Sequence, residues 1–171
     1  MYLGIDPGWS SFGYAQVDGN GELLSIYDTG KPKDHGITTF ISTVLGKPEG
    51  VVSLTMERFV PYDGMYTTAT ETVTMMIGAL QYHYELLGIK VHLFRAIEWK
   101  PALCKWLVKN KGFKNPSIRF DKEFSIAAAE CLCGKSIKSD HRADAICLAY
   151  LGYIYGQQSN ISTTNGTGGK E

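Results

Sequence analysis

Residues 1–13 read MYLGIDPGWSSFG, and this stretch decides how the rest of the sequence is interpreted. An apolar run ends on a carboxylate, Asp6, and Pro7 and Gly8 follow at once. Short apolar runs bounded by Pro and Gly are typical of buried strands. An ionised carboxylate away from water is costly without a partner, so Asp6 either lies in solvent at the strand end or is held by a cation. The simpler alternative is that Asp6, Pro7 and Gly8 form only a turn.

The bulk composition is that of an ordinary globular protein. A chain of 171 residues fits one domain with a full core, and 44% hydrophobic with 20% charged residues is typical of such domains. No apolar run is long enough to cross a bilayer and no basic-then-apolar leader opens the sequence, so we expect a cytoplasmic protein without a membrane partner. The four cysteines have no CxxC pairing and no zinc-ligand spacing, so we expect reduced, mostly buried thiols.

The net charge of zero hides an uneven distribution along the chain. Residues 1–89 hold four Lys or Arg against ten Asp or Glu, whereas residues 90–144 hold twelve against six. A neutral total argues against binding of nucleic acid by bulk charge alone. An acidic site beside a basic flank is the distribution that a metal-dependent enzyme acting on a polyanion needs.

Hydrophobic spacing predicts an α/β protein with a mixed sheet flanked by helices. The strongest turn signal is Asp18-Gly19-Asn20-Gly21, between the second and third strands. The predicted strands are residues 2–6, 12–17, 22–29, 51–56 and 90–95, and the predicted helices are residues 37–45, 65–87, 99–109, 125–132 and 139–155. One domain therefore covers residues 1–156, and the tail 157–171, rich in Ser, Thr, Asn and Gly, is expected to be disordered.

Acidic residues end two of the predicted strands and open the last predicted helix. Glu57 follows the run 51–56 as Asp6 follows the first strand, and residues 139–145, SDHRADA, start the helix. His141 and Asp144 are three residues apart and share a helix face, while Asp140 either caps the helix or points at the same site. Converging carboxylates repel one another unless divalent cations neutralise them, and hard oxygen ligands suit Mg²⁺ or Mn²⁺. We therefore expect a two-metal site that hydrolyses a phosphodiester.

Three motifs in this order, GIDPG, a strand ending in MER and a terminal DHRADA helix, resemble the RuvC family of Holliday-junction resolvases in the RNase H-like superfamily. Trp99-Lys100 before a basic stretch is similar to phage-type and other divergent members. The resemblance covers about residues 1–155. It implies an RNase H-like mixed five-stranded sheet, with three antiparallel strands followed by parallel ones, flanked by helices.

The resemblance also implies residue roles, cofactors and partners. Asp6 would ligate both metals, Glu57 would complete one metal shell and Asp144 would complete the site from the last helix. His141 stands where members carry Asp or His; it is either a site residue that ligates a metal or positions water, or a helix-start histidine with a polar contact. Asp140 is either a further ligand, a cap or a support for a ligand. The family cuts four-way DNA junctions symmetrically and leaves 5′-phosphate ends, which implies two Mg²⁺ per active site, with Mn²⁺ as a substitute, and a homodimer.

The sequence departs from the bacterial pattern after the glutamate. The aromatic residue that bacterial members carry three residues later is Val60 here, and Phe59 or Tyr62 are its candidate replacements at the junction. Basic residues of the second half are expected to contact phosphates as a group, although a solvated surface role is the better interpretation of any single lysine. The candidate DNA contacts are Phe59, Tyr62, Lys100, Lys105, Lys109, Lys111, Lys114 and Arg142. We interpret Trp106 and Phe113 as core residues, and part of the long helix as a candidate dimer interface.

Other functions fit parts of the same pattern. A flap or fork nuclease and an RNase H-type nuclease would use the same acidic site, and cleavage of a panel of branched substrates and a hybrid separates them. A junction-binding module without catalysis would use the carboxylates only to hold the fold, so Asp6→Asn would have no activity to remove. A nucleotide-binding kinase-like fold matches GIDPG alone, and 171 residues are too few for its two lobes.

Overall fold

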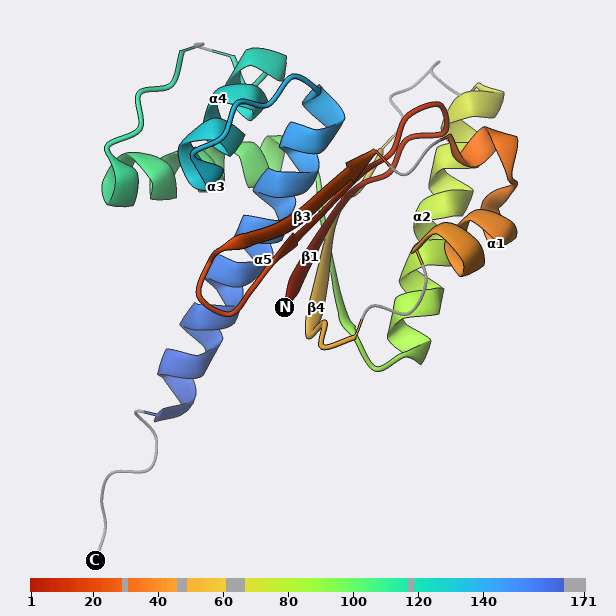
Figure 1. Ribbon diagram of the computed structural model, residues 1–171, viewed down its shortest axis with the longest axis horizontal. Helices are drawn as coiled ribbons and strands as arrows, with labels where there is room; N and C mark the ends of the chain where they lie inside the picture. The colour runs from red at the N-terminus through yellow and green to blue at the C-terminus, as the bar shows by residue number, and fades with distance from the viewer. Residues whose placement is uncertain (29–30, 46–48, 61–66, 117–118, 165–171) are drawn as a thin grey trace, which may run out of the picture.

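The computed structural model describes residues 1–28, 31–45, 49–60, 67–116 and 119–164, which form a five-stranded sheet with helices on both faces (Figure 1). The strands are β1 (Tyr2–Asp6), β2 (Gly13–Val17), β3 (Leu23–Asp28), β4 (Ser53–Glu57) and β5 (Lys90–Phe94). Their order in the sheet is β3-β2-β1-β4-β5. The pairs β1–β2 and β2–β3 are antiparallel, and β1–β4 and β4–β5 are parallel. The predicted mixed sheet is therefore confirmed.

The predicted turn between β2 and β3 forms around one side chain. Asp18 Oδ1 accepts hydrogen bonds from the backbone N–H of Asn20 and of Glu22, both at 2.8 Å. Gly21 adopts a φ of 83°, a left-handed conformation that favours glycine. The turn thus has the residues that its backbone requires.

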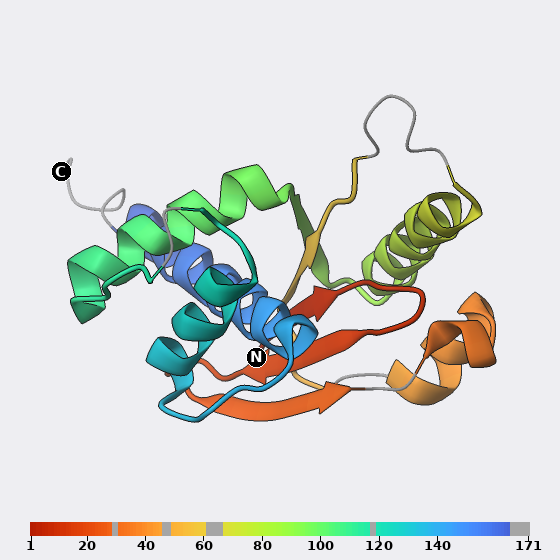
Figure 2. The same cartoon turned by 90° about the horizontal axis from the view of Figure 1, so that it is seen from above.

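The helices divide into two layers, which Figure 2 shows on opposite sides of the sheet. The first layer holds α1 (Ile37–Thr39), continued by a π-helical stretch Phe40–Leu45, and α2 (Thr68–Leu86). The second holds α3 (Ala96–Lys111), α4 (Lys122–Cys133) and α5 (Asp140–Thr164). Each layer packs on the sheet through its own cluster of buried apolar residues. None of the helices in the described part of the chain is both long and apolar enough to cross a membrane.

Helix ends differ from the prediction where capping groups decide them. α3 begins at Ala96, before the predicted Trp99, because Glu98 accepts from the backbone N–H of Arg95. α4 begins at Lys122 because the Asp121 side chain accepts from the N–H groups of the first turn. α5 continues to Thr164, beyond the predicted helix end at residue 155, and residues 165–171 lie outside the described part.

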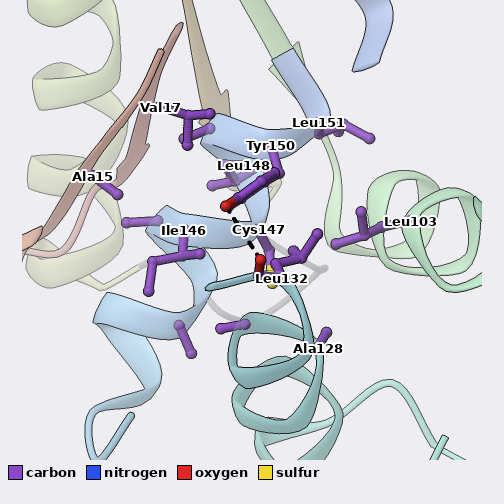
Figure 3. Close-up of a cluster of buried hydrophobic side chains, with 14 of the residues drawn as sticks. Ala15, Val17, Leu103, Ala128, Leu132, Ile146, Cys147, Leu148, Tyr150 and Leu151 are labelled. Atoms are coloured by element: carbon purple, nitrogen blue, oxygen red, sulfur yellow. Dashed lines mark hydrogen bonds between the residues drawn. The ribbon is translucent and has the colours of Figure 1, made fainter. Parts of the chain in front are cut away.

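α5 lies directly on the backbone of the two central antiparallel strands, because glycines face it. A Cβ on Gly4 would lie 2.0 Å from the carbonyl oxygen of Ala145, a contact that no side chain permits. Figure 3 shows the α5 side chains between Ala15 of β2 and Leu132 of α4. Cys147 is fully buried in this layer, and all four cysteines are free. Trp106 and Phe113 also pack against this cluster, as predicted.

Candidate active site

Asp6 and Glu57 lie side by side at the carboxyl ends of two neighbouring strands. β1 and β4 are parallel neighbours in which Ile5 pairs with Met56, so the next residue of each strand is a carboxylate. Residues at the same register position point to the same face of a sheet. Burial raises the pKa of Glu57, a hydrogen bond from Trp99 opposes this, and the negative charges of Asp6 and Asp144 raise it further. The three carboxylates therefore share one electrostatic site.

The first turns of α5 bring Asp144 to this site, where it meets a buried lysine. Lys100 Nζ lies 3.5 Å from Asp144 Oδ1, and the two side chains are only 10% and 19% exposed. Oδ1 itself is buried and makes no hydrogen bond within the described residues. Burial raises the pKa of Asp144, and the charge of Lys100 acts against this rise. The contact is thus a charge–charge interaction at Oδ1, the carboxylate oxygen that makes no hydrogen bond within the described residues.

His141 is held at both ring nitrogens. Its Nδ1 lies 2.6 Å from Asp6 Oδ2, and its Nε2 lies 2.6 Å from Ser11 Oγ. The hydrogen bond with Asp6 raises the pKa of His141, burial opposes the rise, and the charges of Asp6, Asp140 and Asp144 support it. The predicted site residues Asp6, His141 and Asp144 are thereby brought together.

Glu57 receives a hydrogen bond from a helix on the same side of the sheet. Phe94 of β5 pairs with Glu57, and α3 starts two residues later, so its first turns pass over the glutamate. Trp99 Nε1 donates to Glu57 Oε2 at 2.8 Å. The indole is fully buried, and this fixes the carboxylate in the site.

Asp140 lies at the rim of the site and does not cap α5. Ser139 takes that role. Its Oγ accepts a hydrogen bond from the backbone N–H of Arg142 at 3.4 Å, and its carbonyl oxygen accepts one from the backbone N–H of Ala143 at 3.0 Å. Asp140 instead pairs with Lys122 at 2.9 Å, and this contact lowers the pKa of Asp140. Of the three alternatives for Asp140, the structure excludes the cap, because Ser139 precedes it at the helix start, and the roles as a ligand or as a support for one stay predictions.

The carboxylates of the site are ligands of the kind that a hard divalent cation prefers. Among the described residues, no three His, Cys, Asp or Glu side chains already surround one point as metal ligands. Each carboxylate is engaged by a protein donor instead: Asp6 by His141, Glu57 by Trp99 and Asp144 by Lys100. Carboxylate oxygens are the ligands that Mg²⁺ and Mn²⁺ prefer, and the buried Oδ1 of Asp144 lacks a hydrogen bond. Asp6, Glu57 and Asp144 are thus the residues that would hold such an ion.

Comparison with solved structures identifies the fold. The structure of T. thermophilus RuvC in complex with Holliday junction substrate superposes with a TM-score of 0.65 and 19% sequence identity, over 91% of this chain and 94% of that chain. A second Thermus thermophilus RuvC structure gives a TM-score of 0.59 and 20% identity, over 92% and 95%. The chain has the fold of RuvC. Fowlpox virus resolvase in complex with Holliday junction DNA is also similar, with a TM-score of 0.41 and 15% identity over 91% and 99%. The sequence matches no family profile, and no curated protein is significantly similar to it.

Two hollows lie beside residues 58–60 on this RuvC fold, and Glu57 lines the smaller one. A groove of about 600 Å³ runs between residues 58–60 and α2, and a cleft of about 280 Å³ lies between residues 57–60 and 95–97. Phe59 lines both hollows and packs against the core of the α2 layer, and Val60 is 42% exposed. Tyr62, the other candidate for the junction contact, lies outside the described residues.

The predicted DNA contacts on α3 divide between its two faces. Lys100 shares the inward face with Leu103 and Leu107 and is only 8% exposed, so it lies at the acidic site and not on the exposed surface, and its contact with DNA stays a prediction. Lys105 and Lys109 lie on the outer face, where they line a hollow of about 380 Å³ with Trp106 and Asn110. Lys111, Lys114 and Arg142 are exposed as well.

Three residues at the site are not among the predicted site residues. Ser11 is one of two adjacent serines, and Trp99 belongs to the Trp99-Lys100 pair of the resemblance, which does not indicate a contact with Glu57. Arg58 follows Glu57 directly, and its N–H donates to Phe94 O at 2.7 Å, which extends the pairing of β4 with β5. Its place in the MER motif, directly after a candidate ligand, is the signal that could have drawn attention to it.

Proposed function

We propose that this chain is a metal-dependent endodeoxyribonuclease that resolves four-way DNA junctions by paired symmetric hydrolysis. The observation that carries the proposal is the register of β1 and β4, which sets Asp6 beside Glu57 under the first turns of α5. The same fold occurs in a RuvC structure that contains a Holliday junction substrate. The acidic site and the fold together support a RuvC-like reaction better than either does alone.

In this proposal Asp6, Glu57 and Asp144 hold two Mg²⁺ ions per site, with Mn²⁺ as a substitute, and His141 and Asp140 border them. When bound, the cations supply an activated water and neutralise the charge that develops on the phosphate. Trp99 keeps the Glu57 carboxylate in place. His141 is held against Asp6, where it serves either as a further ligand or as a group that positions water. The products carry 5′-phosphate ends.

DNA is proposed to reach the site over the exposed basic residues and the hollows beside Glu57. Lys105, Lys109, Lys111, Lys114 and Arg142 supply phosphate contacts, which are the main source of affinity for a polyanion. Phe59 and Tyr62 are the proposed contacts with the opened junction. Arg58 joins this set, because it lines both hollows and makes no salt bridge with a carboxylate of the described residues.

Two matched cuts require two sites related by a two-fold axis, so we propose a homodimer. α2 offers an apolar face for it: Met75, Tyr82 and Leu86 are 62%, 67% and 68% exposed. Their spacing of seven and four residues places them along one side of the helix.

A substrate panel tests the proposal. It holds a fixed four-way junction, a replication fork, a flap, a linear duplex and an RNA–DNA hybrid, each with Mg²⁺. We expect symmetric cuts in the four-way junction at a rate above all other substrates. Preferential cutting of flaps or of the hybrid would replace the proposal by the corresponding nuclease. Tight junction binding with no cleavage of any substrate would replace it by a binding module.

A further inference from the structure

Ser11 completes a chain of hydrogen bonds that the proposed reaction does not yet use. Its Oγ lies 2.6 Å from Nε2 of His141, whose Nδ1 lies 2.6 Å from Oδ2 of Asp6. The three residues come from the end of β1, the loop after it and the first turn of α5. Ser11 and His141 are 130 positions apart in sequence, so only the fold brings them together.

Two glycines allow the loop and the helix to meet at this point. A Cβ on Gly8 would lie 2.1 Å from the carbonyl oxygen of Ser11, and one on Gly13 would lie 2.0 Å from that of His141. Gly8 lets the loop fold back tightly, and Gly13 lets α5 pack closely on β2. Phe12 anchors the loop between them, because its side chain is 1% exposed and packs edge-to-face on Phe40. The backbone geometry thus holds Ser11 against His141 independently of the side-chain hydrogen bond.

A hydroxyl group suits this place for a chemical reason. It donates to Nε2 when that nitrogen carries no proton and accepts from it when it does. The ring therefore keeps a partner at Nε2 whichever nitrogen is protonated, and Nδ1 stays directed at the carboxylates. Histidines at metal sites commonly have such a partner on the nitrogen away from the metal, which fixes the ring orientation. Without it, the contact with Asp6 alone holds an imidazole that is 38% exposed.

We propose that Ser11 is the positioning residue of His141: its hydroxyl holds Nε2 so that Nδ1 faces Asp6 in the acidic site. Only the expected effect on the cleavage rate rests on the proposed function. The ring orientation itself is a property of the metal-free protein and can be measured without any substrate.

Ser11→Ala tests the proposal, with Ser10→Ala as the matched control, because Ser10 is an exposed neighbour with the same side chain. The first measurement is the ring ¹⁵N chemical shifts of His141 in the metal-free protein, assigned with His141→Gln. We expect them to change in Ser11→Ala and to stay unchanged in Ser10→Ala. The second is the single-turnover cleavage rate at saturating junction, which we expect to fall about 10- to 100-fold in Ser11→Ala. Junction binding with Ca²⁺ should not change.

Ser11→Thr keeps the hydroxyl and is expected to retain the His141 signals and most of the rate. Unchanged His141 signals in Ser11→Ala would overturn the proposal, whatever the rate does. A Ser11→Thr protein as slow as Ser11→Ala would overturn it as well. If the wild type cuts no DNA, the proposed function fails, and the ¹⁵N shifts alone then decide whether Ser11 positions His141.

Discussion

Lys100 and Asp144 form a buried pair at the acidic site, with Nζ 3.5 Å from Oδ1. The lysine therefore partly neutralises a carboxylate that we assign to a metal ion. A positive charge in this position favours the ionised forms of Asp144 and Glu57 in the metal-free protein. It also means that a cation entering the site has to share Asp144 with a group already present.

Replacement of the lysine separates these effects. Lys100→Met leaves Asp144 buried without an opposite charge, and breaking such a pair typically costs about 3–5 kcal/mol. We expect a loss of this size in the free energy of unfolding by urea at pH 8, part of which Mg²⁺ restores. Lys105→Met, on the exposed face of the same helix, is the control. An equal loss in both variants would show that the ion pair has no special role.

Trp99→Phe keeps an aromatic ring in the core and removes the donor to Glu57. A buried acceptor that loses its partner costs about 1–3 kcal/mol, so we expect that loss of stability together with slower cleavage. Trp106→Phe is the matched control, since Trp106 packs against the same core away from the carboxylates. Cleavage by Trp99→Phe at the rate of Trp106→Phe would argue that the hydrogen bond does not hold Glu57 for catalysis.

The acidic site also predicts how stability depends on pH. The pKa values of Glu57, Asp144 and His141 are raised in the folded protein, the first two by burial and the third by its hydrogen bond with Asp6. The folded state then binds more protons than the unfolded state, so stability falls as pH rises. The fall begins above about pH 4 for the carboxyls and above about pH 6.5 for the histidine.

Urea unfolding between pH 5 and pH 8 measures this slope in the metal-free protein. We expect the slope of the free energy of unfolding with pH to be smaller in Asp144→Asn and in Glu57→Gln than in the wild type. We also expect it to be smaller in the wild type with Mg²⁺ than without. The salt bridge of Asp140 lowers its pKa and acts in the opposite sense, with stability lost only as pH falls below about 4. Burial lowers the pKa of His92, which adds stability as pH rises in this range, so the test is the difference between the proteins: the same slope in the wild type and in both variants would be incompatible with the described site.

The proposed dimer depends on the exposed face of α2. Tyr82→Lys places a charge in that face, so we expect sedimentation to show a monomer and junction cleavage to yield single nicks in place of paired cuts. Val108→Lys, at an exposed apolar position of α3, should leave both unchanged. A Tyr82→Lys protein that remains dimeric would remove α2 as the interface.

The sequence predicts most of the architecture, because its signals are local. Carboxylates at the ends of apolar runs and a strong turn at Asp18 are readable without coordinates, and both lie where they were expected. The helix ends that were misplaced depend on side-chain caps such as Asp121. α5 runs beyond the predicted end although its last residues are polar.

The partners of the carboxylates could not be predicted in the same way. The Trp99-Lys100 pair is part of the resemblance but does not indicate a contact, and only the pitch of α3 turns Lys100 inward to Asp144. Ser11 contacts His141, 130 positions away in sequence, because Gly8 and Gly13 permit a close approach of the loop and α5. Such contacts depend on tertiary packing, which spacing along the sequence does not encode.

The central claim is that Asp6, Glu57 and Asp144 hold divalent cations at the phosphate that is cut. Cleavage of a fixed four-way junction by the wild type and by Asp6→Asn, each with Mg²⁺ and with Ca²⁺, tests it most directly. We predict cutting only by the wild type with Mg²⁺, while both proteins bind the junction equally well with Ca²⁺. Cutting by Asp6→Asn at the wild-type rate would contradict the account.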